Sequence, residues 1–397
     1  MITKIININK IETNNKTIEN SDILIENDII IKIANQITDQ ADTIIDANQA
    51  VLTPGFVDSH THPIFINNRS NEFQQRCIGS TYEEIADNGG GILSSIKDIR
   101  NADEDSIFHY CLKNINIFLN NGTTTIEAKS GYGLTLEDEL KSLRVIKRLN
   151  NETHLDIIPT FMGAHAFPPE YVDKKNDYVD IVCNEMIPKV AKEKLAEFCD
   201  VFCEEGYFTI EQTRKIFESA LESNLKLKIH ADEFVDTGAA SLAVEMGAIS
   251  ADHLMVTGDR GKMNLANSDT IATILPGTTF FLGKTTYASG RDLIDKGCEV
   301  AIASDFNAGS CTLQSMSDIM FLSMLYGGLT LYEAFEAATY NGAKAIDRHS
   351  IKGLIKEGYD ADILFWDIVS IDEIPYWFGG SSSRISKIMK SGKVLTI

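Results

Sequence analysis

The sequence lacks any apolar run that approaches the ~18 residues of a membrane-spanning helix. Its first residues, 1–7, also lack the apolar core and the small-residue cleavage site of a secretory signal peptide. The seven cysteines are an odd number in a long chain and do not make a disulfide framework. We therefore predict a cytoplasmic protein without a membrane segment.

Positive charge is also scarce. Lys and Arg number 36 against 57 Asp and Glu, which gives a formal net charge of −21. Because nucleic-acid binding draws on clustered basic side chains, and no such cluster stands out, nucleic acid is excluded as a partner. The hydrophobic fraction of 44% and the charged fraction of 23% are ordinary for a soluble globular enzyme.

The two ends of the chain differ from its middle. Residues 1–50 and 354–397 carry short apolar runs separated by polar turns, a pattern that predicts short strands. In the middle, segments with helix-start signals at Thr135, Thr209 and Thr330 alternate with short apolar runs. The runs that we predict as strands are 56–57, 123–127, 156–161, 201–203, 225–229, 249–251, 270–275 and 300–303.

Strands that alternate with helices favour a parallel sheet, and eight such units fit a (β/α)₈ barrel of the TIM type. We therefore predict an α/β fold in two parts. Residues 54–353 form the barrel, and residues 1–53 and 354–397 pair into one small β-sandwich domain built from both termini.

The stretch 51–62 is a short apolar run with a turn at Pro54-Gly55, and it ends in His60-Thr61-His62. Residues two apart on a strand point to the same side, so these two imidazoles can aim at one point. Two such imidazoles are half of a zinc or iron site. The spacing alone favours two unrelated loop histidines, so the interpretation depends on the rest of the chain.

Histidines gather at the ends of the predicted barrel strands. Barrel enzymes carry their active sites at the carboxyl ends of the strands. The residues that follow the first, third, fifth, sixth and eighth strands are His60 and His62, His165, His230, His253 and Asp305. Five of the eight histidines thus fall at one rim, and we predict that they form one site.

His60, His62, His230 and Asp305 offer three nitrogens and one oxygen, a set that suits one divalent metal with a position left for water. Water on such a metal loses most of its proton affinity, so hydroxide becomes available near neutral pH. Glu233, three residues past His230, is placed to accept a proton and pass it on.

For two of these residues the sequence leaves more than one interpretation open. Glu233 taken alone also fits a solvated loop carboxylate. His253 has two possible roles, stabilising a tetrahedral oxyanion or orienting Asp305.

Several blocks resemble the amidohydrolase superfamily: residues 54–62, the later lone histidines, the aspartate after the eighth strand, and the tail at 358–364. Within this superfamily, the sequence resembles the imidazolonepropionase family more closely than other members. The blocks that carry this resemblance are 127–134, 163–166, 230–234, 251–254 and 305–310. The resemblance covers essentially the whole chain. The chain departs from the family at Ala308, where proline is usual, and at Asn67-Asn68, where a glycine-containing turn is usual.

The resemblance implies roles for individual residues. It places the metal ligands on His60, His62, His230 and Asp305, and the substrate contacts on Arg69, Tyr82, Tyr132, His165, Glu233, Asn307, Gly309 and Ser310. The family's substrate carries a propanoate, and a guanidinium gives a carboxylate a bidentate charged hydrogen bond. Without the resemblance, Arg69 would be interpreted as an ordinary surface arginine.

The fourth strand ends in Cys203-Glu204-Glu205, without a lysine that could bridge two metals once carbamylated. A single metal, zinc or iron, is therefore expected. The resemblance further implies a homodimer and a small-molecule substrate.

The implied activity is hydrolysis of the cyclic amide of 4-imidazolone-5-propanoate to N-formimidoyl-L-glutamate in histidine degradation, by a water that the single metal activates. Glu233, His253 and Asp305 would share the proton transfer and the stabilisation of charge. Two alternatives remain. An aminohydrolase of the same fold would deaminate a heterocyclic base, but a neutral base needs no cationic Arg69. An inactive scaffold would typically lose metal ligands, whereas this chain retains all four.

Overall fold

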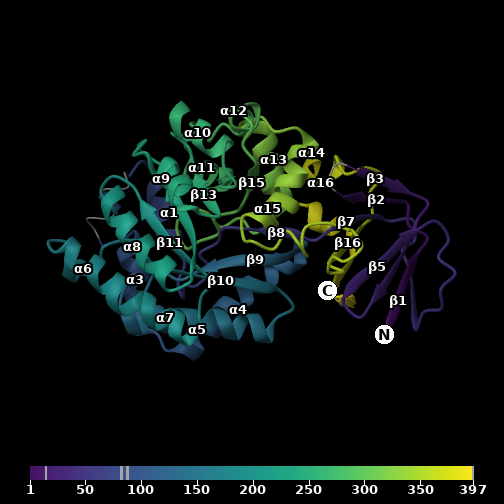
Figure 1. The fold of residues 1–397 in the computed structure, drawn as a ribbon, viewed down its shortest axis with the longest axis horizontal. Coiled ribbons are helices and arrows are strands. Elements are labelled where there is room, and N and C mark those ends of the chain that lie inside the picture. Colours follow the sequence, from purple (N-terminus) through teal and green to yellow (C-terminus); the bar gives the residue numbers. More distant parts are fainter. Residues whose placement is uncertain (14–15, 81–83, 86–88, 396–397) are drawn as a thin grey trace.

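The middle of the chain forms a barrel. The structure, a computed structural model, describes residues 1–13, 16–80, 84–85 and 89–395. One eight-stranded parallel sheet has the order β15-β14-β13-β12-β11-β10-β9-β8 (Figure 1). Its strands are β8 (Phe56–Asp58), β9 (Thr123–Lys129), β10 (Asp156–Ala164), β11 (Phe198–Cys203), β12 (Lys226–Ala231), β13 (Ser250–His253), β14 (Ile271–Ile274) and β15 (Val300–Ile302). Each overlaps one of the predicted runs, so the predicted barrel is confirmed.

Helices lie between the strands and surround the sheet (Figure 1). They are α1 (Ser70–Cys77), α3 (Ile92–Asn101), α4 (Glu104–Asn120), α5 (Leu136–Glu152), α6 (Lys175–Ile181), α7 (Ile187–Glu193), α8 (Ile210–Glu222), α9 (Ala239–Met246), α10 (Asp259–Ala266), α11 (Pro276–Phe281), α12 (Gly290–Asp295), α13 (Met316–Gly327), α14 (Leu331–Ala337), α15 (Tyr340–Lys344) and α16 (Glu373–Tyr376). Two 3₁₀ helices, η1 (Pro169–Tyr171) and η3 (Ser381–Arg384), and one π-helix, η2 (Val182–Met186), complete the helical elements of the described residues. Within the described residues, no helix combines the length and apolarity needed to cross a membrane.

The predicted helix starts are real caps. Thr209 and Thr330 open α8 and α14 with reciprocal capping boxes, because the residue three positions on returns a hydrogen bond to the cap. Thr135 caps α5 by accepting the N–H of Asp138. These caps satisfy N–H groups that have no partner within the helix.

The barrel closes where the segment after β8 meets the segment after β15. Thr61 and Phe306 form a parallel bridge. The N–H of Asp305 donates to the carbonyl of His60 at 3.0 Å, and the N–H of His62 donates to the carbonyl of Phe306 at 2.8 Å. This seam holds residues 60–62 beside residue 305.

The chain ends form two further sheets, with orders β5-β4-β1-β6 and β18-β17-β16-β7-β2-β3. Their strands are β1 (Ile2–Ile6), β2 (Lys10–Thr13), β3 (Lys16–Glu19), β4 (Asp22–Glu26), β5 (Ile29–Ala34), β6 (Thr43–Asp46), β7 (Val51–Pro54), β16 (Ile363–Trp366), β17 (Ile385–Lys390) and β18 (Lys393–Leu395). Ile5 and Ile23 of the first sheet share one apolar core with Leu52 and Phe365 of the second. The predicted β-sandwich from both termini is confirmed, while the domain boundaries stay a prediction.

A cluster of charges around two buried lysines joins the sandwich to the barrel. Lys390 of β17 is 4% exposed and donates to Asp362 at 2.8 Å and to Asp156, the first residue of β10, at 2.7 Å. Lys352 pairs with both of these carboxylates and with Asp360. Because each carboxylate has an ammonium partner, its desolvation is offset.

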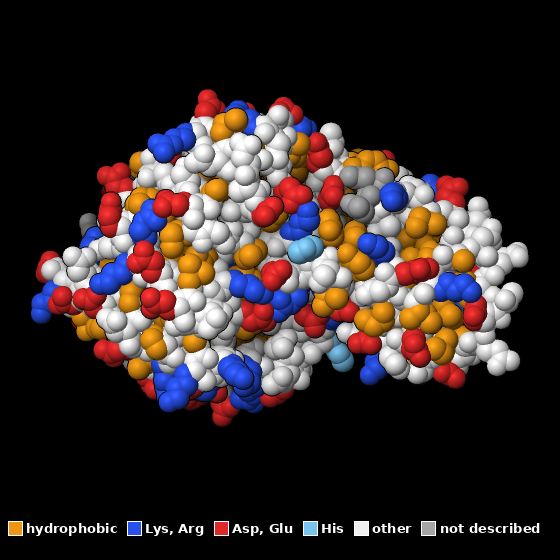
Figure 2. Space-filling view, viewed as in Figure 1, with side chains coloured by type: hydrophobic (Ala, Val, Ile, Leu, Met, Phe, Trp, Pro, Cys, Tyr) orange, Lys and Arg blue, Asp and Glu red, His pale blue; other side chains and the backbone are white. Residues whose placement is uncertain are grey.

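Exposed charges contribute less to stability. Figure 2 shows acidic and basic side chains interspersed over one face of the molecule. Exposed pairs such as Lys32 and Asp39 are screened by solvent and contribute little to stability. The cluster around Lys390 and Lys352 is therefore expected to affect folding more than these exposed pairs do.

We predict that Lys390→Met lowers the free energy of unfolding by about 3 kcal/mol, because two carboxylates lose a buried partner. Denaturant unfolding followed by circular dichroism measures the change. The control is Lys393→Met on exposed β18, which should stay within about 0.5 kcal/mol of the parent protein. Equal losses in the two variants would contradict the prediction.

Candidate functional site

A cavity of about 560 Å³ opens among the segments that follow the barrel strands. The predicted site residues in its lining are His62, Arg69, Tyr132, His165, His230, Glu233, His253, Asp305, Asn307, Gly309 and Ser310. His60 is fully buried and contacts His62. Tyr82 lies outside the described residues. With that exception, the structure brings the predicted residues together.

Parallel strands explain this convergence, because their carboxyl ends meet at one edge of the sheet. His230 lies in β12, and His253 ends β13. The sequence interpretation treated His60 and His62 as strand residues. In the structure they lie just past the end of β8. The bridge at Thr61 keeps that segment extended, so the two rings still face the same point.

Four donor atoms lie close together. The Nε2 atom of His62 is 3.2 Å from that of His60 and 3.3 Å from that of His230. Asp305 Oδ1 is 3.5 Å from His62 Nε2 and 3.6 Å from His60 Nε2. A tetrahedral zinc with bonds of about 2.0–2.1 Å holds its ligand atoms about 3.3 Å apart. The spacing therefore fits a metal ion.

The hydrogen bonds behind the rings support the same conclusion. His60 Nδ1 lies 2.7 Å from a carboxylate oxygen of Asp252, and His230 Nδ1 lies 3.0 Å from one of Asp200. Since a carboxylate only accepts, each Nδ1 carries the proton and each Nε2 carries a lone pair. Burial holds the pKa of His60 and of His62 well below its usual value, which keeps both imidazoles neutral. Lone pairs that converge in this way need a cation between them.

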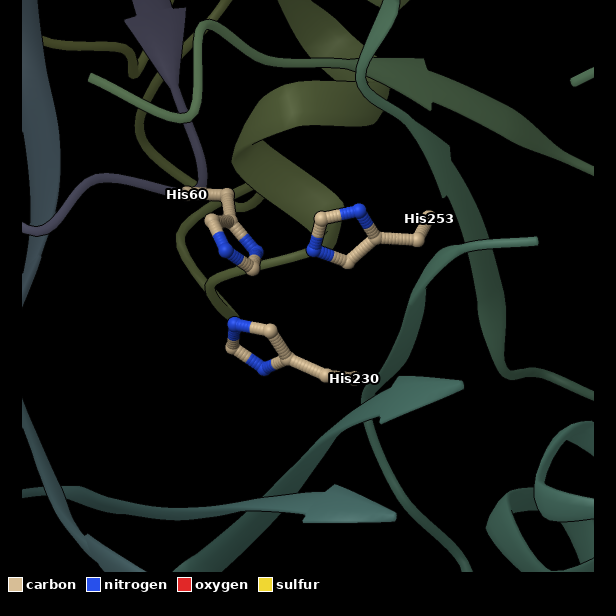
Figure 3. A group of neighbouring side chains, drawn as sticks. All are labelled: His60, His230 and His253. Atoms are coloured by element: carbon tan, nitrogen blue, oxygen red, sulfur yellow. The ribbon is translucent and has the colours of Figure 1, made fainter. Parts of the chain in front are cut away.

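His253 faces the same point (Figure 3). Together with His60 and His230 it forms a second possible metal-binding group. Neither of its ring nitrogens has a hydrogen-bond partner among the described residues. Asp305, which His253 was expected to orient as one alternative, instead accepts a hydrogen bond of 2.5 Å from the hydroxyl of Thr278. Sequence analysis missed Thr278, and the oxyanion role of His253 stays a prediction.

Glu233 lies beside this centre. Its carboxylate is 3.7 Å from His253 Nδ1 and is 8% exposed. Burial, and then the charge of Asp305, raise the pKa of Glu233 to about 8. A carboxyl group with a pKa near neutral can both take up and release a proton.

Glu204 holds the loop that carries Glu233. Its two carboxylate oxygens accept the N–H groups of Phe234 at 2.9 Å and of Val235 at 3.1 Å. Glu204 follows the fourth strand, where the sequence lacked a lysine that could bridge two metals. The carboxylate there binds backbone and so fixes the position of Glu233.

Arg69, also in the cavity wall, packs against Gly309. A β-carbon at Gly309 would lie 1.5 Å from Nη2 of Arg69, so only glycine leaves room for this guanidinium. Arg69 Nε lies 3.8 Å from Glu72, and the side chain is 12% exposed. The result is a positive charge at a fixed place in the wall.

Asn307 and Ser310 bond to each other. The side-chain oxygen of Asn307 accepts the N–H groups of Gly309 at 2.8 Å and of Ser310 at 2.7 Å, and its Nδ2 donates to the Ser310 hydroxyl at 2.8 Å. Asn307 therefore shapes the turn that passes beneath Arg69. Whether these groups also contact substrate stays a prediction.

His165 and Tyr132 line the cavity next to His62. The ring of His165 stacks on that of His62, with 4.9 Å between centroids, and its Nδ1 donates to the carbonyl of Gly131 at 3.0 Å. Tyr132 lies 5.3 Å from His165, centroid to centroid. Burial lowers the pKa of His165 to about 3, so this ring is neutral.

Sequence analysis missed a layer of buried charges beneath the histidines. Lys129, Asp200 and Asp252 lie in β9, β11 and β13, and all three are fully buried. Burial lowers the pKa of Lys129, but Asp200 and Glu127 more than offset this and hold it above its usual value. The available signal was Asp200, a charged residue inside the otherwise apolar strand β11. Arg76 and Lys284, which also line the cavity, gave no comparable signal.

We predict that Thr278→Val weakens Zn²⁺ binding about 10–100-fold, because Asp305 loses the donor that orients it. Competition with a chelator measures the affinity. Thr279→Val is the matched control, since its buried hydroxyl contacts only the sulfur of Met255 among the described hydrogen bonds. Unchanged affinity in Thr278→Val would contradict the prediction.

Known proteins resemble this chain in sequence and in fold. The amidohydrolase family model matches residues 51–395. The imidazolonepropionase of Clostridium tetani is 42% identical over 388 residues, covering 96% of this chain and 92% of the relative. That of Alkaliphilus metalliredigens is 44% identical, covering 89% and 83%.

Among solved structures, a zinc-bound adenosine deaminase from Xanthomonas campestris aligns with a TM-score of 0.73 at 13% identity, over 99% of this chain and 92% of that one. The Aspergillus niger ochratoxinase also has a TM-score of 0.73, at 16% identity, over 99% and 95%. These two likenesses concern the fold alone. The sequence matches go further, and they show that the chain belongs to the amidohydrolase family and, within it, to the imidazolonepropionase family.

Proposed function

We propose that the protein hydrolyses the cyclic amide of 4-imidazolone-5-propanoate to N-formimidoyl-L-glutamate, a step in histidine degradation. The observation that carries the proposal is one cavity that combines a cluster of histidine and aspartate donor atoms with a fixed guanidinium, in a chain of this family. The donor atoms suit hydrolysis, and the guanidinium suits an anionic substrate.

His60, His62, His230 and Asp305 would hold one divalent metal, because their donor atoms are spaced for it. When bound, such a metal polarises a carbonyl oxygen and lowers the pKa of a water molecule. Three histidines and a carboxylate suit both zinc and iron. Elemental analysis of the purified protein decides between them.

Arg69 would bind the propanoate. Its guanidinium is largely buried against Gly309, so a carboxylate there replaces water with a strong charged pair. A neutral heterocyclic base has no group that matches this charge. This end of the cavity therefore supports the propanoate substrate over the base of an aminohydrolase.

Glu233 would move the proton. Water adds to the ring carbonyl carbon, and the bond from that carbon to the ring nitrogen breaks. Glu233 takes the proton that the water loses and delivers it to the leaving nitrogen, which its raised pKa suits. His253, 3.7 Å from Glu233, is the side chain we assign to the developing oxyanion.

A homodimer, a cytoplasmic location and the identity of the metal stay predictions. The first two rest on the resemblance and on the sequence composition. Light scattering on the purified protein measures the oligomeric state.

The test is to mix metal-analysed protein with fresh 4-imidazolone-5-propanoate and to follow the loss of its ultraviolet absorbance. Turnover that disappears in His230→Ala supports the proposal. A metal-loaded protein that leaves this compound intact but deaminates a heterocyclic base would overturn it.

We predict that Arg69→Ala raises KM far more than it lowers kcat, because the lost contact serves the propanoate, away from the reacting carbonyl. Steady-state kinetics at fixed metal loading measures both constants. The control is Arg76→Ala, on the same helix segment, whose guanidinium donates to the carbonyl of Gly309. We expect a smaller rise in KM for Arg76→Ala than for Arg69→Ala. A larger rise for Arg76→Ala would contradict the assignment of Arg69 to the propanoate.

We predict that Glu233→Gln lowers kcat about 10²–10⁴-fold, because the amide cannot accept a proton. Metal content should stay at the parent level, since Glu233 is not among the proposed ligands. Stopped-flow absorbance at saturating substrate gives kcat, and elemental analysis gives the metal. Near-parent kcat in this variant would rule out the proton-transfer role.

A further inference from the structure

Lys129, the last residue of β9, lies inside the barrel beneath the metal-facing histidines. Its side chain is fully buried. The Nζ atom lies 2.7 Å from Glu127 Oε1 and 2.7 Å from Asp200 Oδ2. One ammonium thus holds two carboxylates, one from its own strand and one from β11.

Each carboxylate leads to a proposed metal ligand. The other oxygen of Asp200 accepts the Nδ1–H of His230 at 3.0 Å. The other oxygen of Glu127 accepts the backbone N–H of Thr61 at 3.2 Å, and the Thr61 hydroxyl donates to the carbonyl of Glu127 at 2.5 Å. Thr61 is the residue between His60 and His62.

We propose that Lys129 is a positioning residue for the metal centre. Through Asp200 it orients the ring of His230, and through Glu127 it fixes the backbone between His60 and His62. Three of the four proposed ligands thereby depend on one side chain. The inference rests on the proposed metal site but not on the identity of the substrate.

An opposing effect makes the proposal testable in both directions. An ammonium below a bound cation repels it, so removal of the charge alone would strengthen metal binding. Lys129, however, pairs with two carboxylates at 2.7 Å. Without the ammonium, Glu127 and Asp200 would repel each other and move the groups that they hold, Thr61 and His230. Positioning should therefore outweigh repulsion.

Lys228 provides an internal comparison. It is also fully buried, but its Nζ donates to the hydroxyl of Ser250 at 2.6 Å and to the carbonyl of Ala345 at 3.1 Å. It lies 3.4 Å from Asp252, which accepts the Nδ1–H of His60. This lysine reaches a single ligand over a longer contact, so its loss should matter less.

The experiment measures Zn²⁺ affinity of the full-length protein by competition with a chelator, without substrate. We expect Lys129→Met to bind Zn²⁺ about 10–100-fold more weakly than the parent. The Zn²⁺ affinity of Lys228→Met should lie between those of Lys129→Met and the parent. Lys390→Met is the matched control, because it removes a buried paired lysine at the opposite end of the barrel strands. Its affinity should stay within about twofold of the parent although its thermal stability falls.

An unchanged or higher Zn²⁺ affinity in Lys129→Met would overturn the proposal, as would an equal loss in Lys390→Met. If Lys129→Met does not fold, Asp200→Asn tests the connection from Lys129 through Asp200 to His230. An amide accepts the His230 N–H more weakly than a carboxylate does. We expect at least about a tenfold loss there, and parent affinity would again overturn the proposal. A parent protein that binds Zn²⁺ but leaves 4-imidazolone-5-propanoate intact would refute the function and leave this inference standing.

Discussion

The bridge between Thr61 and Phe306 is the contact on which the site depends. In an open sheet, the first and last strands would lie at opposite edges, far apart. The bridge closes the barrel, and the backbone hydrogen bonds around it place His60 and His62 next to Asp305. Closure of the fold and assembly of the metal-facing group are therefore one event. A change that opened this seam would separate the donor atoms without altering any of them.

Below the seam, the barrel interior is polar where an apolar core would be more stable. Lys129, Asp200 and Asp252 are buried there with no exposure to solvent. Buried charges cost free energy unless each finds a partner. Here Lys129 pairs with Asp200 and Lys228 lies 3.4 Å from Asp252, and the two carboxylates accept the Nδ1–H groups of His230 and His60. The interior thus gives up some stability in return for fixed ring orientations, as sites that need precise geometry commonly do.

The sequence predicted the barrel, the sandwich and the cluster of histidines for one reason. The carboxyl ends of parallel strands converge, so residues such as His230 and His253 can be placed from strand order alone. Thr278 could not be found in this way, because a hydroxyl near a helix start is common and its contact with Asp305 depends on packing. Lys129 ends a strand that also holds three threonines and Glu127, and its two partners come from the fold. Gly309 was assigned to the site through the family resemblance. Its close approach to Arg69 is visible only in three dimensions.

That close approach has an evolutionary consequence. Any side chain at position 309 would need the space that the Arg69 guanidinium occupies, so the two positions are sterically coupled. Position 309 is remote in the chain from the proposed metal ligands on β12 and after β8, and it lies four residues past the remaining one, Asp305. A single substitution there would displace the Arg69 guanidinium while leaving the three proposed histidine ligands in place. A change in the charge of the cavity wall therefore needs no change in any of the histidine donors.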